Sequence, residues 1–351
     1  MTELQPEQQP RLQGQAHMLA NRLGKKFKHL AKWAKRTGAG AFRLYDRDIP
    51  EIPLVLDYYM DADSGDCVSG ALYKRPYEKD EKEEMLWLDA MKEAAAGALG
   101  IDPDCIIIKQ RQRQHGDAQY GKQADSAVTR IITENTLRYK VNLSDYLDTG
   151  LFPDRRLLRN MVQQEAAEKR VLNLFCYTGA YSVAAAAGSA SATCSVDMSN
   201  TYIGWAKDNF SLNKINSRIV SMRDYWHMGN YKANIIVRAD ALVFLKEARQ
   251  RRCTFDAIIL DPPAFSNSKK MTETLDLKRD HPRLLSQCLA LLEPGGKLWF
   301  SANARSFSPS APDLETELKR KYPAVQVSDI SRRLIDEDFR GRKTPRTFLL
   351  S

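Results

Sequence analysis

The stretch VLNLFCYTGAYS, residues 171–182, decides the fold. It begins with a short apolar run of β character, turns at Gly179, and continues into an alanine-rich segment of helical character. Four similar apolar runs follow along the chain: SATCSVD (191–197), NIIVRAD (234–240), FDAIIL (255–260) and KLWFS (297–301). The segments between the runs are long enough for crossover helices, which predicts an α/β, Rossmann-like fold with a doubly wound, mainly parallel sheet.

Groups suited to a nucleoside follow these runs, at the carboxyl ends of the strands where such sheets bind ligands. Gly179 allows a close backbone approach, and the helix after it directs its amino end at a ligand carboxylate or phosphate. Asp197 can accept two hydrogen bonds from a ribose diol, while Asp240 and Asp261 follow the next two runs. The G-x-G-x-x-G fingerprint of nicotinamide enzymes is missing, which favours a ligand with a smaller anion than a pyrophosphate.

Five motifs stand in order at these strand ends: N-x-F-x-Y-T-G (173–179), V-D-M-S (196–199), R-A-D-A (238–241), D-P-P-x-F-S-x-S-K (261–269) and E-P-G-G (293–296). Their order resembles class I S-adenosylmethionine-dependent methyltransferases. The chain is more closely similar to the branch of ribosomal RNA methyltransferases that includes the guanine-N7 half of a bifunctional 23S ribosomal RNA enzyme. The resemblance runs from about Leu19 to the C-terminus and includes NLSDYLDTGLFPDRR (142–156). It implies a seven-stranded methyltransferase sheet and S-adenosyl-L-methionine as the cofactor.

The resemblance also implies a cofactor site. Asp197 would hold the ribose, Asp240 the adenine amino group, and the loop from Phe175 to Gly179 the methionine part. Arg156 would pair with the methionine carboxylate. The full set implied is Phe152, Asp154, Arg156, Asn173, Phe175, Tyr177, Thr178, Gly179, Asp197, Met198, Asp240, Ala241 and Asp261. Simpler roles stay open: a helix cap for Asp197, a surface ion pair for Arg156, and core packing for Met198.

Asp261 stands before two prolines, which force the chain straight out past the sheet edge. This could be no more than a stiff strand exit, or the rim of a methyl-transfer site. Methylation of pyrimidine carbon 5 needs a cysteine nucleophile, but Ala264 and SANARSF (301–307) stand at the usual places. Methylation of an exocyclic amine favours an aromatic residue directly after the prolines, whereas Phe265 comes one position later. Guanine N7 needs neither a nucleophile nor a general base.

We therefore predict methylation of 23S ribosomal RNA at guanine N7 without a covalent cysteine intermediate. Asp261 would line the transfer site, Phe265 would stack on the flipped base, and Asn303, with Ser266 and Asn267, would contact the base edge. Two alternatives stay open. One is another base target, 5-methylcytosine or an exocyclic amine, and the other is a non-catalytic ribosome-assembly factor that binds ribosomal RNA.

The formal net charge of +9 is concentrated near the N-terminus, where seven basic and no acidic residues lie between Arg22 and Arg36. Apolar residues recur there every three to four positions, which predicts a basic amphipathic helix over residues 17–40. Its cationic face could bind nucleic acid, could simply be solvated, or could lie on an anionic membrane. The expected RNA-binding residues are Arg22, Lys25, Lys26, Lys28, Lys32, Arg111 and Arg113, the last two on a basic loop between Lys109 and Lys122.

The remaining expectations concern domain organisation. Residues 1–16 are rich in Gln, Glu and Pro and predict a disordered tail, residues 41–145 predict a small α+β domain, and residues 146–351 the methyltransferase domain. The segment 217–235 is longer than the resemblance leads us to expect, and its Arg223, Tyr225, Trp226 and Tyr231 could stack on bases or merely pack an enlarged loop. Six scattered cysteines predict buried thiols in a reducing cytoplasm, with no metal site, and no apolar run approaches the ~20 residues of a membrane span.

Overall fold

The computed structural model describes residues 8–73, 80–110, 128–228, 233–266, 274–303, 307 and 309–351. The chain divides into two compact units. The N-terminal unit comprises Met1–Thr136 and Val141–Thr149, and the C-terminal unit comprises Leu137–Lys140 and Gly150–Ser351. The division falls in a hairpin of two short strands, β5 (Thr129–Glu134) and β6 (Leu137–Asn142).

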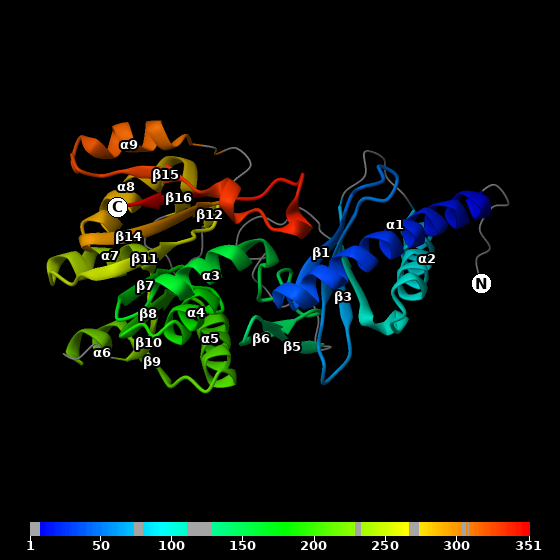
Figure 1. Ribbon diagram of the computed structural model, residues 1–351, viewed down its shortest axis with the longest axis horizontal. Coiled ribbons are helices and arrows are strands. Elements are labelled where there is room, and N and C mark those ends of the chain that lie inside the picture. The colour runs from blue at the N-terminus through cyan, green and yellow to red at the C-terminus, as the bar shows by residue number, and fades with distance from the viewer. Residues whose placement is uncertain are drawn as a thin grey trace. The chain divides into compact units, whose positions relative to one another are not determined.

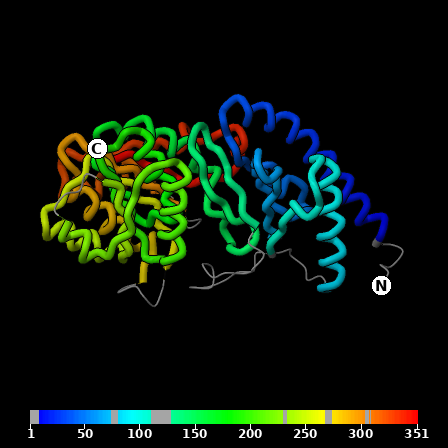
Figure 2. Tube along the Cα trace, turned by 90° about the horizontal axis from the view of Figure 1, so that it is seen from below, coloured from blue at the N-terminus to red at the C-terminus, as the bar shows by residue number. Residues whose placement is uncertain are grey.

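The N-terminal unit is a four-stranded sheet with two long helices. Its strands pair in the order β1 (Ala41–Asp46), β2 (Leu54–Tyr59), β3 (Cys67–Leu72) and β4 (Ile106–Gln110), antiparallel except for β3 with β4. The helices α1 (Gln8–Thr37) and α2 (Glu81–Leu99) lie side by side (Figures 1 and 2). A short 3-10 turn, η1 (Pro103–Cys105), leads into β4. Apolar residues of both helices share one core with β1, β2 and β3.

Helix α1 is longer than the sequence predicts. It begins at Gln8, so the expected disordered tail over residues 1–16 is wrong from that residue onward, and the residues before it lie outside the described part of the chain. The reason is contact with the rest of the unit. Leu12 packs against the core, and the indole Nε1 of Trp87 on α2 donates to the side-chain Oε1 of buried Gln15 at 2.5 Å. These contacts stabilise turns that the polar composition alone does not favour.

The C-terminal unit contains an eight-stranded sheet. Its strand order is β15 (Val327–Asp329), β16 (Arg346–Leu350), β14 (Leu292–Ala302), β11 (Phe255–Leu260), β7 (Arg170–Leu174), β8 (Ala192–Asp197), β10 (Asn234–Arg238) and β9 (Ser217–Ser221). The six strands from β14 to β9 are parallel, and β16 is antiparallel to both of its neighbours. The predicted Rossmann-like class is confirmed. The sheet has one strand more than predicted, and the sequence analysis did not foresee the edge strand β9.

Helices cover both faces of this sheet. In β7, Leu172 and Leu174 pack in one cluster with residues of α7 (Ala241–Gln250) and α8 (Leu277–Leu289). Val171, whose side chain points to the opposite face of the strand, packs in another cluster with α3 (Arg156–Glu165) and α4 (Ala180–Ala187). The other elements are η3 (Pro153–Arg155), α5 (Asn200–Leu212), α6 (Met222–His227), β12 (Phe265–Ser266), β13 (Leu275–Asp276), α9 (Ala311–Lys319), η4 (Ser331–Leu334) and η5 (Glu337–Phe339).

The long segment 217–235 forms β9 and α6 before β10 begins. Tyr225 and Trp226 on α6 are buried, and the ring of Trp226 stacks on Phe244 with centroids 5.1 Å apart. Of the two expected roles for these aromatic residues, the structure supports packing. The inserted strand needs an apolar cover, which α6 provides.

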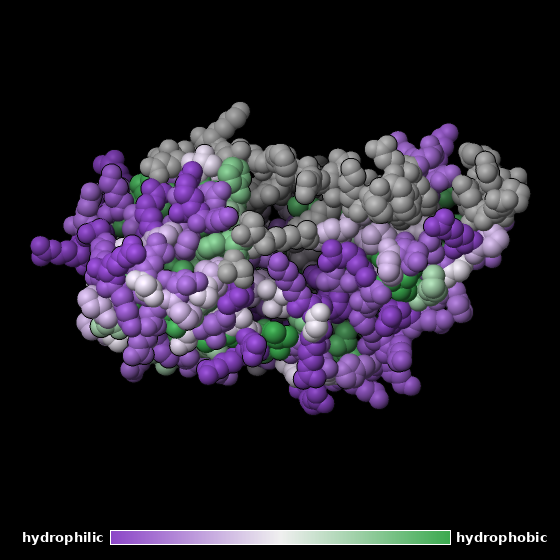
Figure 3. Space-filling model, turned by 90° about the horizontal axis from the view of Figure 1, so that it is seen from above, coloured by the Kyte–Doolittle hydropathy of each residue, from purple (hydrophilic) through white to green (hydrophobic). Residues whose placement is uncertain are grey.

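Hydrophilic side chains cover most of the described surface in the view of Figure 3. Among the described residues, no helix has the length and apolarity needed to cross a bilayer. Within the same residues, no group of three or more His, Cys, Asp or Glu side chains is placed to hold a metal ion.

Candidate functional site

Loops at the carboxyl ends of the central parallel strands form one row. The pairing registers of β11, β7, β8 and β10 place the next residue of each strand at the same level, namely Asp261, Phe175, Asp197 and Arg238. Neighbouring strands lie about 4.8 Å apart, so a ligand of nucleoside size spans three of them. Four of the five sequence motifs therefore meet at this edge of the sheet, as predicted for a doubly wound fold, whereas E-P-G-G (293–296) lies at the start of β14, toward the opposite edge.

The loop between β7 and α4 has an unusual backbone. Phe175, Tyr177 and Gly179 have φ values of 54°, 51° and 71°, in the left-handed region that residues other than glycine rarely adopt. The amide of Tyr177 donates to the Oδ2 of Asp197 at 3.0 Å, which fixes the middle of the loop. Backbone strain of this kind persists only where surrounding contacts hold it, and it concentrates at functional sites.

Further contacts anchor the same loop. The hydroxyl of Thr178 donates to the carbonyl of Gly150 at 2.6 Å, and the Nδ2 of Asn209 donates to the carbonyl of Thr178 at 2.8 Å. A Cβ added at Gly179 would lie 2.8 Å from the Cβ of Ala206. The loop has no room for a side chain at Gly179, and the hydroxyl of Thr178 holds the loop instead of facing a ligand.

Asp197 ends β8 with both carboxylate oxygens in use. Its Oδ1 accepts from the amide of Ser199 at 2.9 Å, and its Oδ2 accepts from the amide of Tyr177. Burial raises the pKa of Asp197 to about 6, although the backbone hydrogen bonds act in the opposite direction. Each oxygen of an ionised carboxylate accepts more than one hydrogen bond, so Asp197 can still accept a ribose diol. The cap of α5 is Ser199, whose hydroxyl accepts from Tyr202, so Asp197 is not the cap residue itself.

Two buried oxygens at this edge have no hydrogen-bond partner among the described residues. One is the Oδ2 of Asp240, whose Oδ1 caps α7 by accepting from Leu242 at 2.8 Å. The other is the Oδ1 of Asn173, whose Nδ2 donates to the hydroxyl of Ser182 at 2.9 Å. A buried acceptor without a donor costs about 1–3 kcal/mol. Both oxygens therefore fit a ligand that supplies N–H or O–H groups, and an adenine amino group suits Asp240.

Aromatic side chains line the outer rim. The ring of Phe152 is exposed, and its centroid lies 5.4 Å from that of Tyr177. The ring of Tyr177 in turn meets that of Tyr202 edge-on, with centroids 4.5 Å apart. Met198, next to Asp197, is half-buried. Ala241 is buried in the core at the start of α7, so its side chain packs there.

Arg156 does not occupy the place expected of it. Its guanidinium is 2% exposed, and its Nη1 donates to Asp336 at 2.6 Å and to Asp338 at 3.4 Å. It is thus part of a buried ion-pair cluster, which is neither the surface pair nor the cofactor contact considered from the sequence. Asp154, in η3, is half-buried.

The preceding residue, Arg155, contacts the D-P-P motif instead. Its Nε and Nη2 each donate to an oxygen of Asp261 at 2.9 Å, and the hydroxyl of Tyr181 donates to the Asp261 Oδ2 at 3.3 Å. The sequence analysis missed Arg155 and Tyr181. Two consecutive arginines give no signal of which one faces the sheet, because η3 sets the direction of each side chain.

The residues after β11 and β14 form the open side of this edge. Phe265, in β12, is 47% exposed, and Asn303 is exposed after β14. Ala264 is exposed between the prolines and β12, and its carbonyl accepts from Leu277 at 3.1 Å. Asn267 lies outside the described residues.

Cys176, the cysteine of the β7–α4 loop, is buried. Desolvation, helped by the charge of Asp197, holds the pKa of Cys176 well above its usual value. A thiol in that state is a poor nucleophile. Packing, as the sequence suggested, is the role that fits Cys176.

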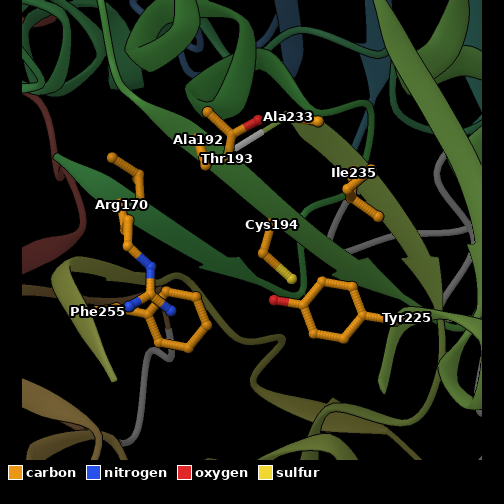
Figure 4. A pocket seen from close by; sticks show the side chains of 9 residues that line it. Arg170, Ala192, Thr193, Cys194, Tyr225, Ala233, Ile235 and Phe255 are labelled. Atoms are coloured by element: carbon orange, nitrogen blue, oxygen red, sulfur yellow. The ribbon is translucent and has the colours of Figure 1, made fainter. Parts of the chain in front are cut away.

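A separate small pocket opens at the other edge of the sheet. Figure 4 shows Arg170, Cys194 and Phe255 around it, with the hydroxyl of Tyr225 directed toward Cys194. These residues belong to the amino ends of β7, β8 and β11 and to α6. The pocket is therefore distinct from the row of loops at the carboxyl ends.

The expected RNA-binding residues fall in the N-terminal unit. Arg22, Lys25, Lys28 and Lys32 are exposed on α1, while the ammonium of Lys26 pairs with Asp48. Arg111 and Arg113 lie outside the described residues. Lys109, which the sequence places at the start of a basic loop, is buried, and its ammonium donates to the carbonyl of Tyr146. Burial lowers the pKa of Lys109 to about 8, so Lys109 does not belong to an exposed cationic face.

Comparison with known proteins gives a consistent result. The protein-family model for S-adenosylmethionine-dependent methyltransferases matches residues 61–334. Ribosomal RNA large subunit methyltransferase K of Neisseria meningitidis serogroup B is 43% identical over 93% of this chain and 85% of its own length. Methyltransferase K/L of Pseudomonas entomophila is 42% identical over 94% of this chain and 41% of its own length.

This chain thus spans about two fifths of the length of the K/L relatives. A solved methyltransferase in complex with SAH superposes with a TM-score of 0.70 at 23% identity, covering 95% of this chain and 81% of the other. This superposition shows that the two proteins share a fold. The chain belongs to the family of S-adenosylmethionine-dependent methyltransferases, the family that includes the ribosomal RNA large subunit methyltransferases K.

Proposed function

We propose that this methyltransferase acts on 23S ribosomal RNA and transfers its methyl group to guanine N7. The names of the relatives at 42–43% identity support ribosomal RNA as the substrate. The observation that supports the target atom is that Asp261 stands at the strand end beside an exposed Ala264 and no reactive thiol. An RNA substrate of this kind places the reaction in the cytoplasm.

The cofactor is S-adenosylmethionine, and we assign its contacts to the row of strand-end loops. Asp197 accepts the ribose hydroxyls, and the unsatisfied Oδ2 of Asp240 accepts the adenine amino group. The strained loop from Phe175 to Gly179 holds the methionine part, under the rim formed by Phe152. The methyl donor is the sulfonium that this cofactor supplies when it is bound.

Guanine N7 suits such a site because it needs only to be positioned. Its lone pair forms the new N–C bond while the C–S bond breaks, and the positive charge moves onto the base without release of a proton. In-line alignment and a nearby carboxylate are then the main requirements. Phe265 stacks on the flipped base, and Asn303 contacts its edge, since both are exposed beside Asp261.

The structure of the cysteines argues against transfer to pyrimidine carbon 5. That reaction begins with addition of a thiolate to the ring. Cys176 is buried with a raised pKa, and burial also raises the pKa values of Cys194 and Cys288, so these thiols stay protonated. Covalent activation of a pyrimidine therefore lacks a candidate nucleophile near Asp261.

We assign phosphate binding to the exposed face of α1. Arg22, Lys25, Lys28 and Lys32 follow one another at intervals of three to four residues and therefore lie along one side of the helix. With about 1.5 Å of rise per residue, the stripe is about 15 Å long, which is enough for two or three successive phosphates. This stripe is the proposed anchor for RNA.

The test is transfer of a labelled methyl group from S-adenosylmethionine to unmodified 23S ribosomal RNA, followed by nucleoside mass spectrometry. We expect 7-methylguanosine as the product. Detection of 5-methylcytosine or N6-methyladenine instead would refute the assignment of the target atom. Asp261→Ala should abolish transfer while ribosome assembly proceeds. If an assembly defect appears on deletion of the gene and Asp261→Ala repairs it fully without any methylation, the protein acts as an assembly factor.

A further inference from the structure

The carboxylate of Asp261 is held by two side chains to which the resemblance assigns no role. The Nε of Arg155 donates to Oδ2 and its Nη2 donates to Oδ1, both at 2.9 Å, in a bidentate arrangement. The hydroxyl of Tyr181 donates to Oδ2 at 3.3 Å. The side chain of Arg155 is 6% exposed and that of Asp261 is 16% exposed. Paired, buried groups in this geometry have their side chains fixed more firmly than a surface pair.

Arg155 stays protonated beside Asp261, and Tyr181 stays neutral. Burial alone would lower the pKa of Arg155, but the charges of Asp261 and Asp154 more than compensate, so the pKa of Arg155 lies above its usual value. Burial raises the pKa of Tyr181, so its hydroxyl remains a neutral donor. Besides Asp261, the charge of Asp154 acts on both Arg155 and Tyr181, and that of Arg159 acts on Tyr181.

We propose that Arg155, assisted by Tyr181, is a positioning residue that fixes the Asp261 carboxylate during methyl transfer. This inference rests on the proposed role of Asp261 at the transfer site. An ionised carboxylate offers about four acceptor positions, and the three hydrogen bonds from Arg155 and Tyr181 leave one of them for the substrate. Asp261 therefore presents a directed acceptor to a base N–H and does not remove a proton.

Position in the fold explains why Arg155 can do this. It is the last residue of η3, and the next residue, Arg156, starts α3 and turns toward Asp336 and Asp338. Tyr181 lies on α4, directly after the strained cofactor loop. Two elements that flank the cofactor thus meet on one carboxylate, so the transfer site is linked mechanically to the cofactor loop.

The experiment compares Arg155→Gln, Arg155→Lys and Tyr181→Phe with the wild type and with Arg332→Gln, an exposed control on η4. Single-turnover methyl transfer to 23S ribosomal RNA is measured alongside the Kd for S-adenosylhomocysteine. We expect Arg155→Gln to lose transfer by about 100-fold at pH 7.5, with Kd changed less than about threefold. Arg155→Lys, which keeps the charge but not the fork, should fall between, and Arg332→Gln should match the wild type.

The split between transfer rate and cofactor affinity separates positioning from a structural role. A variant that merely destabilises the fold should lose both, whereas loss of positioning lowers the rate and leaves the Kd for S-adenosylhomocysteine within about threefold. A folded Arg155→Gln protein with the wild-type rate would overturn the proposal. If that variant does not fold, Arg155→Lys and Tyr181→Phe decide, and unchanged rates in both would overturn it equally.

A double-mutant cycle separates this inference from the proposed function. If Arg155 acts through Asp261, Arg155→Gln should cause no further loss in an Asp261→Asn background. If the losses caused by Arg155→Gln and by Asp261→Asn added fully, the positioning role of Arg155 would be contradicted, while the transfer site proposed for Asp261 would stand. Wild-type activity of Asp261→Asn would instead contradict the transfer site proposed for Asp261, and with it the basis of this inference.

Discussion

Arg156 and Asp338 form a buried ion pair that joins the start of α3 to η5. Nη1 of Arg156 lies 3.4 Å from Oδ1 of Asp338, and the two side chains are 2% and 0% exposed. Asp336 adds a second acceptor at 2.6 Å from the same nitrogen. The pair connects the segment before the sheet to the segment before β16, which are 182 residues apart in the chain. Its contribution is therefore to the fold of the unit.

We predict that Asp338→Asn lowers the free energy of unfolding by about 1–3 kcal/mol, because the buried guanidinium of Arg156 then keeps only Asp336 as a charged partner. Urea unfolding of the purified protein measures this. The Kd for S-adenosylhomocysteine, taken well below the unfolding transition, should stay within about threefold of the wild-type value. Asp208→Asn serves as the control, since its pair with Lys140 is largely exposed and its loss should leave stability unchanged within error. If Asp338→Asn weakened the binding of S-adenosylhomocysteine and left the free energy of unfolding unchanged, Arg156 would belong to the cofactor site.

The raised pKa of Asp197, about 6, predicts that cofactor binding depends on pH. A ribose diol donates to the ionised carboxylate, so the protein must release a proton before it binds below that pKa. Affinity should be constant above about pH 7 and fall toward tenfold for each unit below about pH 6. Without ligand, the effect of pH on folding stability runs the other way. The folded state binds this proton more tightly than the unfolded state does, so Asp197 contributes most to the free energy of unfolding at acidic pH. That contribution is lost as pH rises through 6.

Calorimetric titration with S-adenosylhomocysteine between pH 5 and 8 checks this dependence. Asp197→Asn should bind more weakly at pH 8 and lose the pH dependence in the acidic range. The control is Asp208→Asn, which changes an exposed carboxylate on α5 and should follow the wild-type curve. A Kd for the wild type that is the same at pH 5 and pH 8 would show that the charge of Asp197 takes no part in binding.

The positions of the strand-end residues could be predicted from sequence, because the pattern of apolar runs and the pairing of parallel strands determine where these residues lie. Short apolar runs end where the sheet ends, so Asp197, Asp240 and Asp261 had to meet at one edge. Helix α1 was harder, since its first turns are stabilised by Trp87, 72 residues away from Gln15. The amino-acid composition around Gln15 does not indicate its contact with Trp87.

The same limit explains the exchange of roles between Arg155 and Arg156. Both residues stand in one motif, and their side chains diverge because η3 ends between them. Strand β9 was missed for a related reason, as its exposed edge residues lack the apolar character of the central strands. Sequence pattern finds a buried strand far more readily than an edge strand.

The cationic face of α1 predicts a salt-dependent interaction with RNA. Replacing Lys25, Lys28 and Lys32 with Gln removes three exposed charges. The slope of log K against log salt should then become shallower by about 2 to 3, because each phosphate contact releases about one counterion. Filter binding of a 23S ribosomal RNA fragment between about 50 and 300 mM salt gives the slope.

The matched control removes three exposed charges from the C-terminal unit, with Lys246, Arg249 and Arg252 changed to Gln. Its slope should remain closer to that of the wild type. Equal losses in the two triple variants would show that net charge, and not the face of α1, governs binding. An unchanged slope in the α1 variant would remove this helix from the RNA interface.

Gly179 predicts a sharp contrast between two glycine substitutions. Gly179 has a φ of 71°, and a Cβ there would lie 2.8 Å from the Cβ of Ala206, so Gly179→Ala forces the cofactor loop to move. Gly204, inside α5, has nothing within 4 Å of an added Cβ, and Gly204→Ala should stabilise the protein by about 0.5–1 kcal/mol. We expect Gly179→Ala to weaken S-adenosylhomocysteine binding by about tenfold or more, since a displacement of the loop disturbs the amide of Tyr177 and its bond to Asp197. Thermal unfolding and calorimetric titration of both variants measure the contrast, and equal cofactor affinity in the two would show that the strained loop does not form the cofactor site.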